Sequence, residues 1–280
     1  MNVRGLVDLW LGRPHNPVGA DGRMALADHL RELRARIIRC VVVLVVLFIV
    51  ALFFYDQLLE LISHPYNEAR KNIPQDTKSL VVVSGVTAGL TLQLKLCGVA
   101  ALVASSPYWL LQIWGFIVPG LHPKEKKWTR VFAAVAGPLF LVGVATGYYV
   151  LPKGIAVLVG FTPNNATNLI DFTSFFSFTA RMLLVFGISF EIPLFVIMLN
   201  LAGVVSGKAL GKYRPWIIIG VFVFAAVATP STDPFSMLML AIPMLVLFLL
   251  AEVIARLSDR ARKRGRDSTD NWDDDLVSPL

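Results

Sequence analysis

The sequence predicts an all-α integral membrane protein with six transmembrane helices and both termini in the cytoplasm. The chain has 280 residues, of which 56% are hydrophobic and only 16% are charged, whereas soluble domains carry about 25% charged residues. The charges are segregated, so that long segments carry almost none. The net charge of +7 comes from basic residues that flank the apolar segments, which indicates membrane topology and not nucleic-acid binding.

The amino-terminal part is expected to contain a tail, an interfacial helix and the first span. Residues 1–23 predict a loosely ordered cytoplasmic tail. In residues 24–39, apolar side chains recur at helical spacing among arginines, which predicts an amphipathic helix that lies in the interface and runs into span one, 37–54. The long external connection 55–90 should contain a helix over 56–67 and a short extended piece at 81–83.

Three further spans and their loops follow. Span two is expected over 91–118 with a kink at Pro107, and span three over 131–151. The intervening loop, 119–130, is strongly basic and therefore cytoplasmic. The segment 152–173 predicts a polar external loop, and span four covers 175–205.

The carboxyl-terminal part predicts two spans and a tail. Span five, residues 216–229, has only about 14 residues, fewer than the roughly 17–25 of a full crossing. It follows a basic loop and is joined by a tight external turn to span six, 235–254. Residues 255–280 are first basic and then acidic, which predicts a disordered cytoplasmic tail. The expected organisation is therefore 1–23, 24–256 and 257–280, with a six-span membrane domain between two tails.

No motif indicates an enzyme, a metal site or a cofactor site. The two cysteines fall inside apolar spans, and the four histidines show no ligand spacing. Nucleophile, metalloprotease and phosphate-loop motifs are absent from the sequence. We therefore expect neither catalysis nor a cofactor.

Glu191 is an acid inside the fourth apolar segment, and Pro193 follows it. A charge at membrane depth is expensive, so such an acid is a candidate functional residue. The proline should bend the helix and free the carbonyl of Ser189. Three interpretations stay open, namely a satisfied buried acid, a polar lining for a passenger, and proton transfer.

Glu32 and Glu125 are each the lone carboxylate of a basic cytoplasmic segment. One interpretation is local charge balance, with Glu32 pairing with Arg36 one helical turn later. The other is that the two carboxylates together receive two cations of a ligand. Arginine suits this best, because its planar fork grips a carboxylate through two hydrogen bonds.

Four motifs, in this order, resemble the TatC family, the core membrane subunit of the twin-arginine protein translocase. They are HLRELRARI at 29–37, IWGFIVPGLHPKEKK at 113–127, FGISFEIP at 186–193 and TPSTDPFSMLMLAIP at 229–243. The resemblance covers roughly residues 24–256 and leaves out the two tails.

The resemblance implies a curved, glove-like bundle of six helices in the bacterial cytoplasmic membrane. It also implies a receptor for signal peptides with consecutive arginines, which assembles with TatA- and TatB-type single-span proteins and with itself in a larger complex. That complex would pass folded proteins across the membrane by means of the proton-motive force.

The resemblance also implies roles for individual residues. Glu32 and Glu125 match the acids that receive the arginine pair, and Glu191 matches an acid on the concave side. The remaining positions belong to the cytoplasmic site (Leu33, Arg34, Phe116, Pro119 and the 121–127 loop with Leu121 and Lys124), to the external loops (Pro65 and Asp233) and to partner docking (Thr229 and Met237). The family often has a glutamine near the place of Met237.

A proton-coupled secondary transporter with Glu191 as the proton carrier is the alternative function. Transporters of that class often contain repeated halves. Residues 37–151 and 175–254 show no such similarity, which favours the translocase interpretation.

Overall fold

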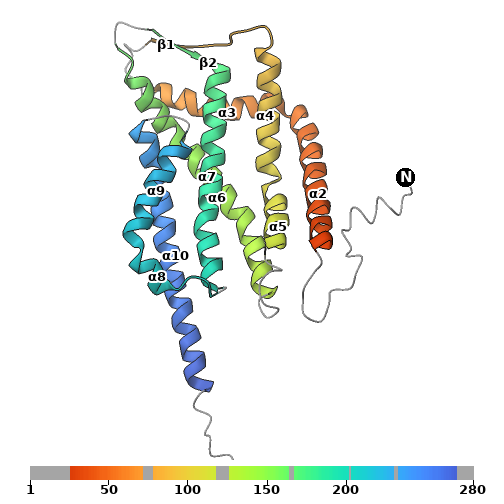
Figure 1. Cartoon of the computed structure of the whole chain (residues 1–280). Coiled ribbons are helices and arrows are strands. Elements are labelled where there is room, and N and C mark those ends of the chain that lie inside the picture. The colour runs from red at the N-terminus through yellow and green to blue at the C-terminus, as the bar shows by residue number, and fades with distance from the viewer. Residues whose placement is uncertain are drawn as a thin grey trace, which may run out of the picture. The chain divides into compact units, whose positions relative to one another are not determined.

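The computed structural model describes most of the chain (Figure 1), namely residues 26–71, 78–117, 126–163, 167–201, 203–229 and 233–269. The chain divides into two compact units, residues 1–184 and 185–280. The division falls inside one long helix, and each unit is described by itself.

The described residues of the first unit form five helices and the start of a sixth. They are α2 (Leu26–Phe53), α3 (Tyr55–Lys71), α4 (Ala88–Ala104), α5 (Ser106–Ile117), α6 (Lys126–Gly160) and the first part of α7 (Phe172–Leu201). α2 packs along α4, α5 packs along α6, and α3 runs across one end of α2 to reach α4 and α6 (Figure 1). The apolar core between α3, α4 and α7 contains Ile62, Leu92, Leu96, Phe176, Ala180 and Leu183.

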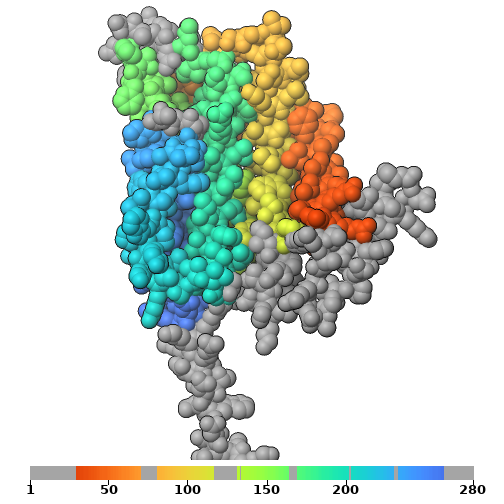
Figure 2. All heavy atoms as spheres, in the orientation of Figure 1, coloured from red at the N-terminus to blue at the C-terminus, as the bar shows by residue number. Residues whose placement is uncertain are grey.

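α2 is a single helix, so the arginine-rich helix runs into span one without a break, as predicted, and its place in the membrane interface stays a prediction. Its sequence contains no proline or glycine, and nothing therefore interrupts the backbone hydrogen bonds between the arginine-rich start and the apolar end. Figure 2 shows α2 at the edge of the first unit, bordered by α4 on one side. Val41, Val45 and Ile49 are exposed on it, as expected of a helix that faces lipid.

The predicted kink in span two is confirmed as a break between α4 and α5. The two helices meet at an angle of 55°, with Ser105 between them. Pro107 has no N–H group and cannot continue the helical hydrogen-bond ladder. Near the break, the carbonyl of Leu102 accepts hydrogen bonds from Ser105 Oγ and Trp109 Nε1, both at 3.1 Å.

The predicted external loop 152–173 is wrong over its first half. α6 continues through Pro152 to Gly160 because its last turns bury Ile155 and Val159. The rest of the connection contains β2 (Thr167–Asp171), which pairs in parallel with β1 (Lys78–Val82), Lys78 lying opposite Thr167. The extended piece expected at 81–83 is thus largely confirmed as β1, and its partner strand was not predicted.

The second unit consists of the end of α7, α8 (Gly207–Lys212), α9 (Arg214–Ala228) and α10 (Pro234–Thr269). α9 runs antiparallel to α10, and α8 packs on α10 (Figure 1). Their shared core is built on Leu210, Phe248 and Ala255.

Two expectations for this unit are wrong. The basic loop contains a helix, α8, whose cap is Ser206: its Oγ accepts a hydrogen bond from the Ala209 N–H group at 3.2 Å. The carboxyl-terminal tail is helical as far as Thr269, since Ala255 and the residues around it pack on α8. Residues 270–280 lie outside the described part of the chain.

The helices agree with the predicted spans in position. Within the described part of the chain, four helices are long and apolar enough to cross a membrane, and the bent α4–α5 pair is a fifth candidate. α9 is a shorter apolar helix of 15 residues, as expected for span five. The count of six crossings and the curved shape of the bundle stay predictions.

Asp171 caps the amino terminus of α7. Its Oδ2 accepts a hydrogen bond from the Ser174 N–H group at 2.8 Å, and its Oδ1 accepts one from Ser84 Oγ at 3.1 Å. These bonds favour the ionised carboxylate, and the Ser174 backbone bond contributes most to lowering the pKa of Asp171 below its ordinary value. The stabilisation is therefore present above the ordinary carboxyl pKa and is lost as the pH falls through the lowered value.

We predict that Asp171→Ala lowers the melting temperature of the detergent-purified protein at neutral pH. The difference in melting temperature between this variant and the parent protein should become smaller at acidic pH, because protonation removes the stabilising effect of Asp171 in the parent. Asp171→Asn keeps an oxygen acceptor for Ser174 and should lie between the two. Circular dichroism melts from neutral pH to about pH 3 measure the effect. An Asp171→Ala melt equal to that of the parent at neutral pH would contradict the capping role.

Candidate functional site

The candidate site begins at Glu32 and Arg36, one turn apart near the start of α2. Arg36 Nε and Nη2 donate hydrogen bonds to the same oxygen, Glu32 Oε1, at 3.0 and 2.6 Å. The two side chains are 21% and 20% exposed. The local pair expected from the sequence is therefore confirmed.

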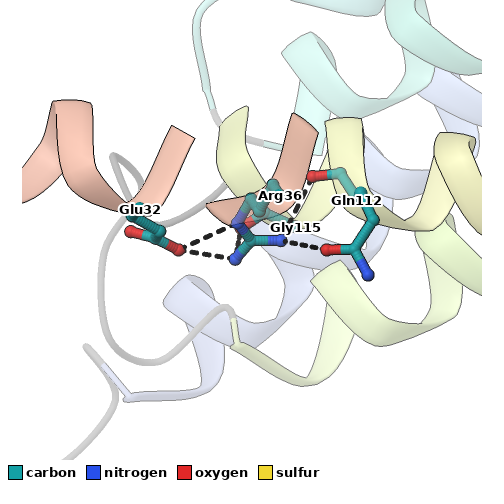
Figure 3. Close-up of polar contacts among 4 residues, drawn as sticks. All are labelled: Glu32, Arg36, Gln112 and Gly115. Atoms are coloured by element: carbon teal, nitrogen blue, oxygen red, sulfur yellow. Dashed lines mark hydrogen bonds and ion pairs between the residues drawn. The ribbon is translucent and has the colours of Figure 1, made fainter. Parts of the chain in front are cut away.

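Arg36 also connects α2 to the end of α5 (Figure 3). Nη1 donates to the backbone oxygen of Gln112 at 3.1 Å and to its Oε1 at 3.2 Å, and Nη2 donates to the Gly115 oxygen at 3.1 Å. Together with the two bonds to Glu32, this employs all five N–H donors of the guanidinium. Lysine, with three donors on one nitrogen, could not make the same set.

Gly115 makes room for this contact. A Cβ atom at this position would lie 2.8 Å from Arg36 Nη1, so any larger residue would displace the guanidinium. The Gly115 carbonyl is also one of the last four of α5, which have no partner inside the helix. Arg36 therefore satisfies the helix end and adds a favourable interaction with its dipole.

Glu32 contacts Arg36 through one of its two carboxylate oxygens. Oε1 accepts both bonds from Arg36, and no donor among the described residues contacts Oε2. Arg36 thus fixes the orientation of the carboxylate without using up its acceptor capacity.

The structure brings part of the predicted cytoplasmic site together. Glu32, Leu33 and Arg34 lie on α2, and Phe116 lies on α5 directly after Gly115. Leu33 and Phe116 are half-buried, whereas Arg34 is exposed. The remaining predicted residues, Pro119, Leu121, Lys124 and Glu125, lie outside the described residues, so their place beside Glu32 stays a prediction.

Glu191 lies on α7 in the second unit and is half-buried. The helix continues through Pro193, which is buried, and Ser189 Oγ donates to the Val185 carbonyl at 2.6 Å. The bend at Pro193 and each of the three interpretations of Glu191 stay predictions.

Four further residues were predicted for the external loops and for partner docking, and the structure shows the burial or the hydrogen bond of each. Pro65 is fully buried inside α3, and Thr229 is buried at the end of α9. Met237 is half-buried in the first turn of α10. Asp233 Oδ1 accepts the Ser236 N–H hydrogen bond at 2.7 Å and so caps α10 as Asp171 caps α7. Docking of partners at Thr229 and Met237 stays a prediction.

Sequence reasoning missed a second acidic centre, Glu252 on α10. It is 2% exposed and binds Arg214 at 2.7 Å and Arg256 at 2.6 Å. The spacing of Glu252 and Arg256, one turn apart, was the available signal for one of these pairs. Within the described part of the chain, no group of three or more His, Cys, Asp and Glu residues could hold a metal ion.

We predict that Arg36→Lys destabilises the first unit by about 1–3 kcal/mol, because buried acceptors on α5 lose their donors. Arg31→Lys is the matched control, since Arg31 is exposed on the same helix. Thermal unfolding in detergent measures both variants. Equal melting temperatures for the two would contradict the role of Arg36 as the link between α2 and α5.

We also predict that Asp233→Ala costs about 1 kcal/mol of folding free energy through loss of the α10 cap, and that Asp233→Asn costs less. The same unfolding measurement distinguishes them. If Asn destabilised as much as Ala, the negative charge and not the capping bond would be the feature that matters.

The known proteins named below all carry the same name, TatC, and their matches cover most of the length of this chain. The family model described as Sec-independent protein translocase protein (TatC) matches residues 28–243. The TatC protein of Frankia casuarinae is 40% identical over 268 residues, which cover 93% of this chain and 74% of the relative. The TatC protein of Escherichia coli K12 is 32% identical over 232 residues, or 82% and 88% of the two chains.

Solved structures show the same relationship. A crystal structure of the twin-arginine translocase receptor TatC matches with a TM-score of 0.68 at 28% identity, over 82% of this chain and 99% of the other. A second TatC crystal structure, in the detergent DDM, matches with a TM-score of 0.69 at 28% identity, over 81% and 99%.

Proposed function

Because this chain belongs to the TatC family of Sec-independent protein translocase components, we propose that it is the signal-peptide receptor of a twin-arginine translocase. Membership makes it a protein-transport component and a multi-pass protein of the cytoplasmic membrane. The proposal adds that it binds the paired arginines of a signal peptide at its cytoplasmic face. It further adds assembly with TatA- and TatB-type single-span proteins and transport of folded proteins by means of the proton-motive force.

The open oxygen of Glu32 is the observation that supports the proposal most. A carboxylate that must be oriented by its ligand loses conformational entropy on binding, whereas one already oriented by Arg36 does not. The Glu32 side chain is 21% exposed, so that a ligand can reach it while water screens it only in part. An arginine of the peptide would bind Oε2 while Arg36 keeps Oε1.

Phe116 and Leu33 add a reason for peptide selectivity. Both are half-buried apolar residues close in sequence to the polar contacts of Arg36. A signal peptide that offers an apolar side chain beside its arginines would cover this surface. Glu125 is the proposed acceptor for the second arginine, as the family resemblance implies.

We predict that Glu32→Gln weakens binding of a twin-arginine peptide about tenfold or more, because a charged hydrogen bond contributes about 1.5–3 kcal/mol. Glutamine keeps an oxygen acceptor for Arg36, so this variant separates ligand binding from folding. Glu60→Gln, at an exposed acid of α3, is the matched control and should bind normally. Fluorescence polarisation of labelled peptide against the protein in nanodiscs gives the affinities.

The same assay compares Arg-Arg and Lys-Lys peptides on the parent protein. Lysine lacks the planar fork and should bind more weakly. Equal binding of the two peptides, or unchanged binding by Glu32→Gln, would show that Glu32 does not recognise arginine. Depletion of the chain in cells that carry a folded twin-arginine reporter tests the wider role, and continued export would contradict it.

A further inference from the structure

The second unit contains a pocket of 540 Å³ between α8 and α10. Lys208, Gly211 and Lys212 line it from α8, and Arg256, Asp259 and Arg260 line it from α10. Four of these six residues are basic. None of them belongs to the proposed signal-peptide site.

The acids near the pocket are already occupied. Asp259 Oδ2 accepts the Gly207 N–H hydrogen bond at 2.7 Å, and Oδ1 accepts one from Asn200 Nδ2 at 3.0 Å. The buried carboxylate of Glu252 lies between Arg214 and Arg256. The four basic residues of the pocket and Arg214 carry five positive charges, and Asp259 and Glu252 carry two negative charges. The excess is three positive charges.

The three uncompensated cations are Lys208, Lys212 and Arg260. All three are exposed, and none has an acidic partner among the described residues. Lys212 lies over the ring of its neighbour Tyr213, with its Nζ 5.7 Å from the ring centroid. The cations thus line a concave surface that is suited to an anion.

The walls of the pocket are held in place by close backbone packing. A Cβ atom on Gly207 would lie 2.8 Å from the Arg256 backbone nitrogen, so α8 lies directly on α10. Arg256 in turn is held by its 2.6 Å contact with Glu252. The cations therefore project from a rigid frame, which reduces the entropy lost when they bind a ligand.

The position of the pocket along the helices identifies the kind of anion. It lies where the apolar helix α9 begins, and the candidate span of α10 ends at Ala261. Tyr213 and Trp216 are 53% and 72% exposed beside it, and such aromatic residues collect at the level of lipid headgroups. Leu257, one turn before Ala261, is an exposed apolar residue on α10 and can accompany an acyl chain.

We propose that this pocket binds the phosphate group of an anionic phospholipid headgroup. Basic pockets between helices at the cytoplasmic surface are suited to this ligand class. A soluble phosphate has the same chemistry, but only a lipid brings it to this depth together with an apolar chain. The bound lipid would hold α8 against α10 at the membrane surface.

The test substitutes Lys208, Lys212 and Arg260 together with glutamine. Arg256 is retained, because its removal would leave Glu252 buried beside one arginine fewer. The control triple variant replaces Lys95, Lys153 and Arg181 with glutamine, which removes the same charge from exposed positions in the first unit. Native mass spectrometry of the detergent-purified protein, titrated with phosphatidylglycerol or phosphatidylcholine, measures retained lipid.

We expect the parent protein and the control variant to retain phosphatidylglycerol in preference to phosphatidylcholine. Each cation near an anionic headgroup contributes about fivefold in affinity, so the pocket variant should lose about a hundredfold. Single substitutions at Lys208 and Arg260 should each lose about fivefold, which keeps the test valid if the triple variant does not fold.

Two results would overturn the proposal. One is retention of phosphatidylglycerol by the pocket variant at the level of the parent protein. The other is binding of sodium phosphate, at matched ionic strength, with the affinity of the lipid, which would assign the pocket to a soluble anion. No signal peptide enters this assay, so its outcome is independent of the receptor proposal.

Discussion

The hydrogen bonds of the Arg36 guanidinium hold together two helices of the first unit and also orient the candidate site. The guanidinium fastens α2 to the carboxyl end of α5 and orients Glu32 with the same set of five N–H donors. A group that is saturated in this way can neither rotate nor exchange partners without the loss of several hydrogen bonds. The packing of the two helices is therefore coupled to the orientation of the Glu32 carboxylate, and a change in either would alter the other.

Two acidic centres among the described residues, Glu252 and Glu32, differ in how far their oxygens are used within the chain. Glu252 lies between two arginines and is 2% exposed, so its acceptors are filled from within the chain and no ligand can reach it. Glu32 binds one arginine and is 21% exposed. The same chemistry, a carboxylate facing guanidinium groups, thus occupies both oxygens of Glu252 but only Oε1 of Glu32 among the described residues.

The sequence predicted the helical spans because hydropathy depends on local composition, and it predicted the break at Pro107 because proline acts on its own turn. It could not predict the contact of Arg36 with Gln112, 76 residues away, or the pairing of β1 with β2. Both depend on tertiary packing. Pro152 shows the same limit, because burial of Ile155 and Val159 in the following turns keeps α6 helical beyond the predicted end.

The contrast between the basic predicted cytoplasmic segments and the carboxylate of Glu32 is also relevant to specificity for a ligand. Most of the predicted cytoplasmic segments are basic, and the chain carries a net charge of +7, so a cationic peptide is repelled by most of this surface. Specificity is a difference between affinities, and repulsion elsewhere increases it as effectively as attraction at the site. A basic surface attracts anionic lipid, whereas an isolated, pre-oriented carboxylate selects a cation. In the proposed receptor, the small number of acids on this face would therefore increase the specificity of a carboxylate such as Glu32 for a cationic peptide.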